Sequence, residues 1–347
     1  MKRILVRTLL ILGILPVLFG LFLLWSTIIE YRPADSIIIQ DTKKVPALKD
    51  SMIYSAMIWN IGYAGLGANM DFFYDGGEKV RDSRRNVSDN VKAISSLIQQ
   101  NDTIDFILIQ EVDISSKRSY GIDEYRRFDS LLADHQGSIG INYKVGFVPE
   151  PPLKPLGRVK SGIATFTVFQ PQSVIRYAFH GNYSWPTRIF MLKRCYLVNR
   201  YPLKNGKEFV LINTHNSAYD DGSLRAAQLK QLEKFAMAEF EAGNFVLIGG
   251  DWNQSPAEFK PNFRYTFDTV NVSYLPKDFL SGWQQEYTSD CPTNRRITTP
   301  YNPDTTPATV IDFYIASPNI KVLKLRAINL EFRNSDHNPV LLTFILK

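Results

Sequence analysis

The chain of 347 residues is 45% hydrophobic and 13% aromatic, which provides for a large core and excludes an intrinsically disordered protein. Its formal net charge is +6, of which residues 1–30 supply +2 and the rest only +4. This mildly basic balance fits an anionic substrate or surface without requiring a nucleic acid, and two cysteines are too few for a disulfide scaffold.

Residues 1–30 predict a membrane anchor. Three basic residues precede the segment 8–29, which contains no charged residue. At about 1.5 Å per residue, a helix of this length reaches across a hydrocarbon core of about 30 Å. A cleaved signal peptide, with its shorter apolar region, and a buried helix of a soluble domain are the alternatives. Because basic residues precede the segment, we expect the remainder outside the cytoplasm, periplasmic or extracellular.

Residues 31–50 predict a stalk, and residues 51–347 predict one domain, because no linker or repeat divides them. Apolar runs typical of strands follow in chain order at 55–61, 104–111, 161–169, 173–179, 189–200, 207–216, 244–251, 309–317 and 339–347. An apolar stripe with helical spacing predicts one helix around 87–98. A second helix is expected over 223–243, with Ser223 as its N-cap and Gly243 at its end. This mixed order predicts an α/β fold of two packed sheets covered by helices.

Six of these strand ends carry side chains drawn from Asn, Asp, Glu and His. They are Asn60, then Glu111, then Asn213 with His215 and Asn216, then Asp251 with Asn253, then Asp312, then Asp336 with His337. In layered α/β proteins, functional sites form where strand ends meet at one edge of a sheet. Each residue alone fits a turn, a cap or a core histidine, but the set predicts a site.

This set of side chains suits phosphoester hydrolysis. Carboxylate and amide oxygens are ligands for Mg²⁺ or Mn²⁺, and imidazoles donate hydrogen bonds to a phosphate or protonate a leaving oxygen. The chain has no G-x-x-x-x-G-K motif and no G-x-S-x-G motif, which argues against ATP-driven chemistry and against an α/β-hydrolase. In "VLIGGDWNQSP", residues 246–256, two glycines precede Asp251. We interpret them as a tight exit that lets the backbone approach a phosphate.

The motifs "MIWNIGY", "LIQEVD", "SGIATFT", "NTHNSAYDDGSLRAAQLKQL", "IGGDWNQSP", "VIDFYIAS" and "SDHNPV" span residues 57–340. Together they resemble the endonuclease/exonuclease/phosphatase superfamily, which includes deoxyribonuclease I, abasic-site endonucleases, neutral sphingomyelinases and inositol-polyphosphate 5-phosphatases. The resemblance implies a four-layer α/β/β/α sandwich, here with an N-terminal transmembrane helix, as in a membrane-anchored member of bacterial type.

The resemblance also implies a metal cofactor, Mg²⁺ or Mn²⁺. Glu111 matches the main metal-binding carboxylate, and Asn60 matches the first-strand amide that helps to hold the metal or its water. Asp336 matches an aspartate that contacts the metal or a water.

The remaining matched residues carry catalytic roles in the family. Asp251 matches the aspartate that orients or deprotonates the attacking water, and Asn253 matches the amide that steadies this aspartate and the phosphate. His215 matches a histidine that contacts the scissile phosphate in the deoxyribonuclease and sphingomyelinase branches. Asp312 matches the aspartate that pairs with the terminal histidine, His337, and keeps it charged.

The expected function is therefore metal-dependent hydrolysis of a phosphoester, most simply a phosphodiester. The alternatives are an endonuclease acting on DNA or RNA, a phosphomonoesterase acting on a sugar or inositol phosphate, and a binding module without activity. A lipid headgroup fits the predicted membrane anchor, and no obligate protein partner is evident. The basic loops 151–162 and 293–298 are candidates for gripping an anionic substrate, or are ordinary solvated loops.

Overall fold

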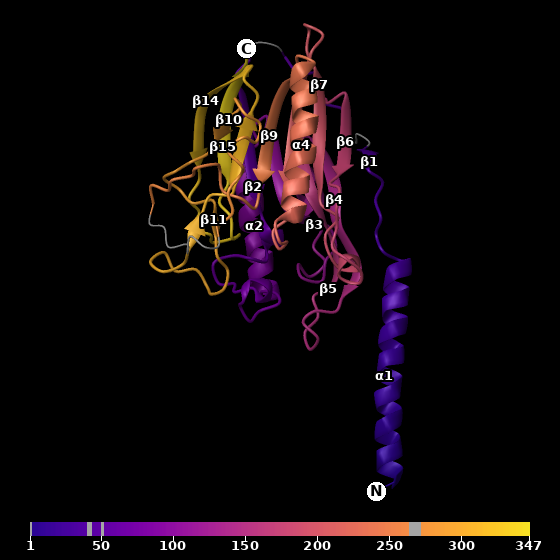
Figure 1. Cartoon of the computed structure of the whole chain (residues 1–347). Helices are drawn as coiled ribbons and strands as arrows, with labels where there is room; N and C mark the ends of the chain where they lie inside the picture. Colours follow the sequence, from indigo (N-terminus) through magenta and orange to yellow (C-terminus); the bar gives the residue numbers. More distant parts are fainter. Residues whose placement is uncertain (1, 40–43, 50–51, 264–271) are drawn as a thin grey trace.

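The computed structural model describes residues 2–39, 44–49, 52–263 and 272–347, with side chains from Gly13 onward. Two mixed β-sheets form its centre (Figure 1). The six-stranded sheet has the order β14 (Ile320–Ala327), β15 (Val340–Leu346), β2 (Tyr54–Asn60), β3 (Phe106–Asp113), β5 (Gly157–Thr167), β4 (Gln136–Val148). The seven-stranded sheet has the order β1 (Ser36–Ile39), β6 (Ser173–Ala178), β7 (Cys195–Pro202), β8 (Glu208–His215), β9 (Phe245–Asp251), β13 (Asp312–Ala316), β10 (Gln284–Glu286).

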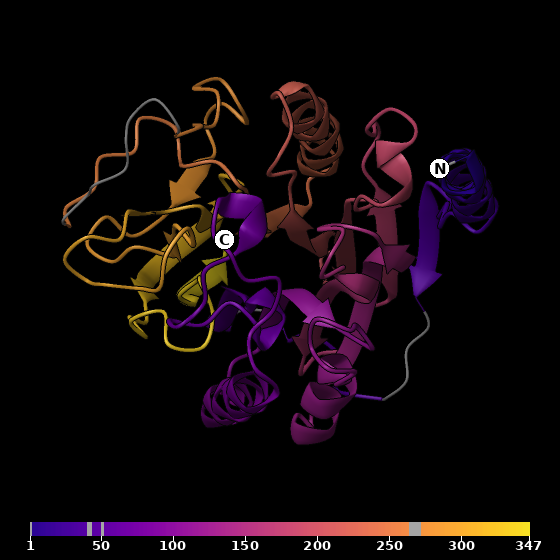
Figure 2. The same cartoon turned by 90° about the horizontal axis from the view of Figure 1, so that it is seen from below.

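Helices cover the outer faces of both sheets. α2 (Arg84–Gln100) and α3 (Glu124–Leu131) pack on the six-stranded sheet, and α4 (Ser223–Glu241) packs on the seven-stranded sheet. Figure 2 shows α4 on one side of the paired sheets and α2 and α3 on the other. The layers therefore follow the order α/β/β/α, and the expected α/β fold is confirmed.

Alternation along the strands explains why these sequences are apolar without interruption. On β2, Ala56 and Ile58 belong to the core between the sheets, whereas Met57 and Trp59 belong to the core beneath α2. Successive side chains of a strand point to opposite faces, so a strand covered on both faces requires apolar residues at every position. Each fully buried aliphatic side chain contributes about 1.5–3 kcal/mol of transfer free energy.

The two longer helices of the domain begin as their sequences suggest, with one difference. Ser83 caps α2, because its hydroxyl accepts a hydrogen bond of 3.1 Å from the Asn86 amide. For α4 the N-cap residue is Gly222 in a left-handed conformation, and Ser223 is the first helical residue. The prediction of Ser223 as a cap is wrong by one position, because the left-handed turn at Gly222 starts the helix instead.

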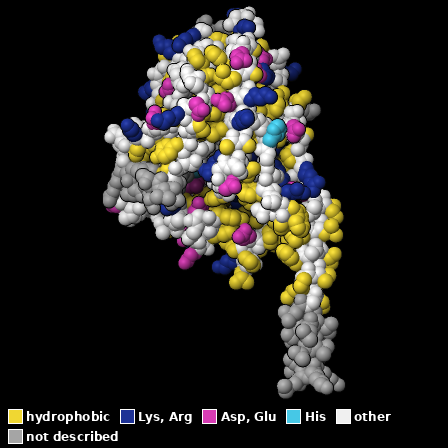
Figure 3. Space-filling view, in the orientation of Figure 1, with side chains coloured by type: hydrophobic (Ala, Val, Ile, Leu, Met, Phe, Trp, Pro, Cys, Tyr) yellow, Lys and Arg dark blue, Asp and Glu magenta, His cyan; other side chains and the backbone are white. Residues whose placement is uncertain are grey.

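The N-terminal helix, α1 (Lys2–Ile28), projects away from the body in Figure 1. Hydrophobic side chains lie along its described part, as Figure 3 shows, and Leu18 and Phe19 are among the exposed ones. Within the part of the chain that the structure describes, however, no helix has the length and apolar character needed to cross a membrane. The prediction of a transmembrane helix over 8–29 is therefore not supported.

The segment expected to form a stalk contributes to the domain. β1 pairs antiparallel with β6, with Ser36 opposite Tyr177 and Ile39 opposite Val174. Three consecutive isoleucines favour this edge strand. Residues 40–43 and 50 of the predicted stalk, and residue 51 of the predicted domain, lie outside the described residues. Both cysteines, Cys195 and Cys291, are free.

Candidate active site

Strand pairing brings the polar strand ends to one edge of the two sheets. β2 and β3 run parallel with Asn60 opposite Gln110, and β8 and β9 run parallel with His215 opposite Asp251. β13 runs antiparallel to β9 and places Asp312 opposite Asp251. Because parallel strands end at the same edge, residues that are far apart in sequence become neighbours there.

His337 lies just before β15 and forms a pair with Asp312. Its Nδ1 lies 2.8 Å from Asp312 Oδ2, and both side chains are buried. Burial lowers the pKa of His337, but the carboxylates of Asp312 and Asp336 outweigh it and raise this pKa to about 10. The ring is therefore charged at neutral pH. Its Nε2 lies 3.0 Å from Asn294 Nδ2, and which of the two atoms donates depends on the protonation of the ring.

Asp251 is the centre of the hydrogen-bond network. Its Oδ2 accepts a hydrogen bond of 2.8 Å from Asn60 Nδ2, and its Oδ1 accepts one of 2.9 Å from the backbone N–H of Asn253. The side-chain amide of Asn253, which was expected to steady Asp251, donates instead to the Asn216 carbonyl oxygen 2.9 Å away. His337 Nε2 lies 3.9 Å from Asp251 Oδ2. Burial raises the pKa of Asp251 to about 6, although charged His337 lowers it. The pKa of this carboxylate is thus close to neutral pH, which is the range that suits a general base best.

His215 is the second imidazole of the site and has the opposite electrostatic character. Its Nε2 lies 3.4 Å from Asp251 Oδ2 and 3.9 Å from Glu111 Oε1, while its buried Nδ1 has no hydrogen-bond partner among the described residues. Burial, with the charges of Arg194 and His337, holds the pKa of His215 well below its usual value. One histidine is therefore charged and the other neutral, so they suit different tasks.

Glu111 is aimed at the site by an irregular backbone. It has a φ of 56° and lies at a β-bulge between β3 and β5, where the register shifts between Ile109 and Val112. A non-glycine residue in this region is strained by about 1–3 kcal/mol, and bulges of this kind redirect a side chain. Its carboxylate is 25% exposed and has no hydrogen-bond partner within the described residues.

Three oxygen donors suit a hard divalent cation: the Glu111 carboxylate, the Asn60 amide oxygen and the Asp336 carboxylate. Burial first, and then the Glu111 charge, raises the pKa of Asp336 to about 7. A carboxylate whose ionised form is disfavoured by burial and by a neighbouring carboxylate is compatible with a bound cation. These residues fit Mg²⁺ or Mn²⁺.

Asp251, Asp312 and His337 form another group, in which the possible ligand atoms lie within 4.8 Å of one another. This group fits a metal less well. The Nδ1 of His337 is already hydrogen-bonded to Asp312, and a protonated imidazole has no lone pair for a metal. We interpret the group as a hydrogen-bonded charge cluster.

A cavity of about 330 Å³ opens beside these residues. Its catalytic end is lined by the residues described above, except Asp312, and by Arg194, which lies just before β7. One guanidinium nitrogen of Arg194, Nη1, is buried without a hydrogen-bond partner among the described residues. Burial lowers the pKa of Arg194, and the Glu111 and Asp251 charges oppose that shift. The sequence analysis missed Arg194, because nothing in "LKRC" distinguishes it from a surface arginine.

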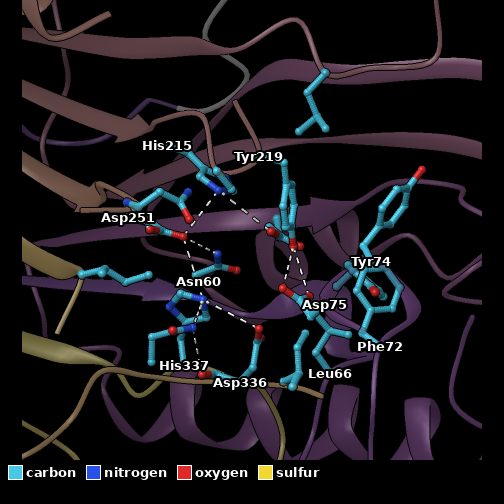
Figure 4. Close-up of a pocket in the computed structure, with 18 of the residues that line it drawn as sticks. Asn60, Leu66, Phe72, Tyr74, Asp75, His215, Tyr219, Asp251, Asp336 and His337 are labelled. Carbon is cyan, nitrogen blue, oxygen red and sulfur yellow. Dashed lines mark hydrogen bonds and ion pairs between the residues drawn. The ribbon is translucent and has the colours of Figure 1, made fainter. Parts of the chain in front are cut away.

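The other end of the cavity, which we call the aromatic end, is lined by Leu66, Phe72, Tyr74, Asp75 and Tyr219. Figure 4 shows these side chains beside the group formed by Asn60, His215, Asp251 and His337. The sequence analysis missed the aromatic end as well. Its available signal was the position of Tyr219, four residues after His215.

The two basic loops differ in what they contribute. From 293–298, Asn294, Arg295, Arg296 and Ile297 line the cavity, whereas Leu156 and Ser161 are the lining residues from 151–162. The prediction that the loop 293–298 grips an anionic substrate does not hold for Arg295. Its guanidinium donates to backbone carbonyls such as those of Gly67 and Met70, at 2.8 and 3.2 Å, so it braces a loop.

The interpretation of the two glycines before Asp251 is also corrected. A Cβ at Gly249 would lie 2.7 Å from the Tyr314 ring and 2.8 Å from Ile58, between the sheets. A Cβ at Gly250, whose φ is 152°, would lie 2.0 Å from the Thr214 carbonyl oxygen of the adjacent strand. Both glycines therefore permit close packing of protein against protein, and neither is required by an approach to a phosphate.

A family model described as the Endonuclease/Exonuclease/phosphatase family matches residues 57–337. No curated protein matches the sequence. An endonuclease/exonuclease/phosphatase structure from Beutenbergia cavernae DSM 12333 is similar, with a TM-score of 0.54 and 18% identity, over 85% of this chain and 72% of that one. The human Nocturnin catalytic domain with bound sulfate anion has a TM-score of 0.53 and 17% identity, over 89% and 98% of the two chains.

D. rerio TDP2 complexed with a single-strand DNA product has a TM-score of 0.51 and 16% identity, over 85% of this chain and 99% of that one. At these identities the likeness concerns the fold alone. The family match, in contrast, covers most of the chain and includes every strand end at which the polar side chains meet. The chain belongs to the endonuclease/exonuclease/phosphatase family.

Proposed function

We propose that the chain is a metal-dependent phosphodiesterase in which Asp251 activates a water for in-line attack on phosphorus. Members of the family are generally phosphoester hydrolases. The observation that carries the proposal is the contrast between a buried carboxylate with a pKa of about 6 and an imidazolium with a pKa of about 10, 3.9 Å apart. Groups whose pKa values are pushed apart in one site suit a base and a cationic stabiliser.

In this mechanism Asp251 accepts a proton from water while the water oxygen forms its bond to phosphorus. Asn60 and Asn253 hold the carboxylate in place through the hydrogen bonds at 2.8 and 2.9 Å. The bond between phosphorus and the leaving oxygen breaks on the opposite side. Charged His337, supported by Asp312, and Arg194 stabilise the negative charge that builds up on the phosphoryl oxygens.

Glu111, Asn60 and Asp336 would hold the divalent cation. A bound divalent cation would supply positive charge that offsets the negative charge developing during phosphoester cleavage. Neutral His215 donates a hydrogen bond from Nε2 toward the phosphate or toward Asp251, which lies 3.4 Å away. It adds no positive charge, so the charge balance rests on His337, Arg194 and the cation.

The test uses the purified full chain, stripped with EDTA and then supplied with Mg²⁺ or Mn²⁺. We expect hydrolysis of bis-p-nitrophenyl phosphate only after metal is restored, and faster hydrolysis of this diester than of p-nitrophenyl phosphate. DNA and sphingomyelin complete the panel. Metal binding without hydrolysis of any of the four would favour a binding module and overturn the proposal, and faster hydrolysis of the monoester would favour a phosphomonoesterase.

An endonuclease is the second candidate. The cavity is lined by five arginines, at positions 118, 194, 225, 295 and 296, and the D. rerio TDP2 structure contains a single-strand DNA product. The mild net charge of +6 does not supply the strong basic surface that most nucleases use. The DNA arm of the panel decides between the two candidates.

We also propose that the catalytic domain lies outside the cytoplasm, on the basic residues that precede the apolar segment 8–29. Alkaline phosphatase fused to the C-terminus is active only after export, so a fusion that is active in cells is the expected result. An inactive fusion that is stably produced would place the domain in the cytoplasm.

A further inference from the structure

Most of the cationic side chains at the cavity are already neutralised within the protein. Arg118 forms an ion pair of 3.0 Å with Asp113 and lies 3.6 Å from the centre of the Tyr63 ring. Arg225 forms an ion pair of 2.8 Å with Asp220. With Arg295 bound to carbonyls, these side chains are not free to bind a second phosphate. Three of the five arginines that line the cavity are therefore engaged within the protein, and Arg194 and Arg296 are the other two.

The aromatic end has a different composition. The ring centres of Phe72 and Tyr74 lie 5.6 Å apart, and those of Tyr74 and Tyr219 lie 6.1 Å apart. Asp75 lies among them, and the Tyr219 hydroxyl donates to its two carboxylate oxygens at 3.3 and 3.1 Å. The charges of Arg296 and Arg295 also act on Asp75 and favour its ionised form. Ring faces and a carboxylate hydrogen-bonded to a tyrosine hydroxyl thus line one side of the cavity.

Burial raises the pKa of Asp75 to about 6, against the hydrogen bond from Tyr219, and the Glu111 charge raises it further. The Glu111 charge also raises the pKa of Tyr219. Asp75 and Asp251 both line the cavity of about 330 Å³. One ligand can therefore place its phosphate beside Asp251 and another group beside Asp75.

Three kinds of ligand group can be compared at this end. A second anion would be repelled by Asp75, and an uncharged alkyl group would add no charge to offset that of the carboxylate. A substituted ammonium group is attracted both by the carboxylate and by the negative faces of aromatic rings. A group with methyl substituents suits the rings especially well, because its charge is spread over a bulky apolar surface.

We propose that the substrate is a phosphoester whose alcohol carries a substituted ammonium group, held by Phe72, Tyr74, Asp75 and Tyr219 while the phosphate lies at the catalytic end. This inference rests on the proposed function. It selects, among the phosphoesters that such a site could hydrolyse, those with a zwitterionic headgroup of the choline type.

The test compares two diesters with the full chain and Mg²⁺: p-nitrophenyl phosphorylcholine, and p-nitrophenyl 3,3-dimethylbutyl phosphate, in which carbon replaces the cationic nitrogen. The two have the same shape and the same leaving group. We expect kcat/KM for the choline ester to be about tenfold higher or more, since cation–π contacts and a carboxylate act together. In Asp75→Asn this ratio should fall to within about threefold of one, because the charge is lost and the shape is kept.

The matched control is Glu78→Gln, which removes an exposed carboxylate three residues away and should keep the full ratio. The ratio of the two kcat/KM values is measured within one variant, so a change that affects both substrates equally does not alter it. Hydrolysis of bis-p-nitrophenyl phosphate without any preference for the choline ester would overturn this inference and leave the proposed function standing. Failure to hydrolyse any diester would overturn the proposed function itself. A faster rate on p-nitrophenyl thymidine 5′-phosphate than on the choline ester would assign the aromatic end to a nucleobase.

Discussion

The two ends of the cavity are built in different ways. The catalytic end takes its side chains from the ends of strands in both sheets, as with Asn60 on β2, His215 on β8 and Asp251 on β9. The aromatic end takes most of its side chains from one loop, residues 66–75, and adds Tyr219 from the loop before α4. One end is fixed by sheet register, and the other by loop conformation.

This difference also extends to electrostatics. At the catalytic end, charged groups stand close together, with Asp312 2.8 Å and Asp251 3.9 Å from the charged ring of His337. At the aromatic end, Asp75 has a neutral hydroxyl as its partner. Because a rigid framework carries reacting groups and loops vary more readily, we expect changes at the first end to remove activity and changes at the second to alter selectivity.

Asp251→Asn is expected to have the largest effect. It removes the proposed base while keeping the shape that Asn60 and the Asn253 amide hold. We expect kcat for bis-p-nitrophenyl phosphate to fall by about 10³-fold or more. The midpoint of urea unfolding should change little, because the loss of one hydrogen bond, where the new NH2 group faces an N–H donor, is offset by no longer burying an ionised carboxylate. Asp134→Asn, at an exposed position, is the control, and an active Asp251→Asn enzyme would refute the assigned role.

Asp312→Asn is expected to lower the rate by about 10²-fold and to move the pH profile. Activity requires ionised Asp251, above a pKa of about 6, and charged His337, below a pKa of about 10. The Asp312 charge raises both pKa values, so its loss should shift both limbs of the kcat profile toward lower pH. A profile of reduced height with unmoved limbs would show that Asp312 does not act through charge.

Arg194→Ala should reduce kcat/KM for bis-p-nitrophenyl phosphate by about 10- to 100-fold, the range for a hydrogen bond to a charged group. Its buried Nη1 has no partner among the described residues and is therefore available to a phosphate oxygen. Arg158→Ala, at an exposed position of β5, is the matched control. Equal effects of the two substitutions would indicate only a general loss of positive charge.

The catalytic end was predictable from sequence because its parts are local. An apolar run ending in a polar residue, such as "LIQE", marks both a buried strand and the side chain at its edge, and the family resemblance supplied the roles. The left-handed φ of 56° at Glu111 was not predictable, because glycine or asparagine normally marks such a position. It depends on the bulge that β5 imposes.

The structure also contains elements that the sequence did not predict. β14 lies at the edge of the six-stranded sheet, and most of its side chains are exposed or half-buried. Its sequence "IKVLKLRA" therefore carries lysines and an arginine at positions where a buried strand would carry apolar residues. β4 includes three glycines, which weaken a strand pattern, and α3 has only eight residues. The aromatic end was missed for a related reason, since the meeting of Tyr74 and Tyr219 depends on two loops whose paths are set by tertiary packing.

The smallest expected effect belongs to Tyr74→Leu, which keeps apolar volume but removes one ring of the aromatic end. Because a single cation–π contact at a partly exposed site contributes about 0.5–1 kcal/mol, the preference for p-nitrophenyl phosphorylcholine over its dimethylbutyl analogue should fall about two- to fivefold. Tyr74→Phe keeps the ring and removes the hydroxyl, which lies 3.4 Å from Glu150, so it should keep the preference. If Leu and Phe at this position behave alike, the ring face is not what holds the ammonium group, and Asp75 alone must account for any selectivity.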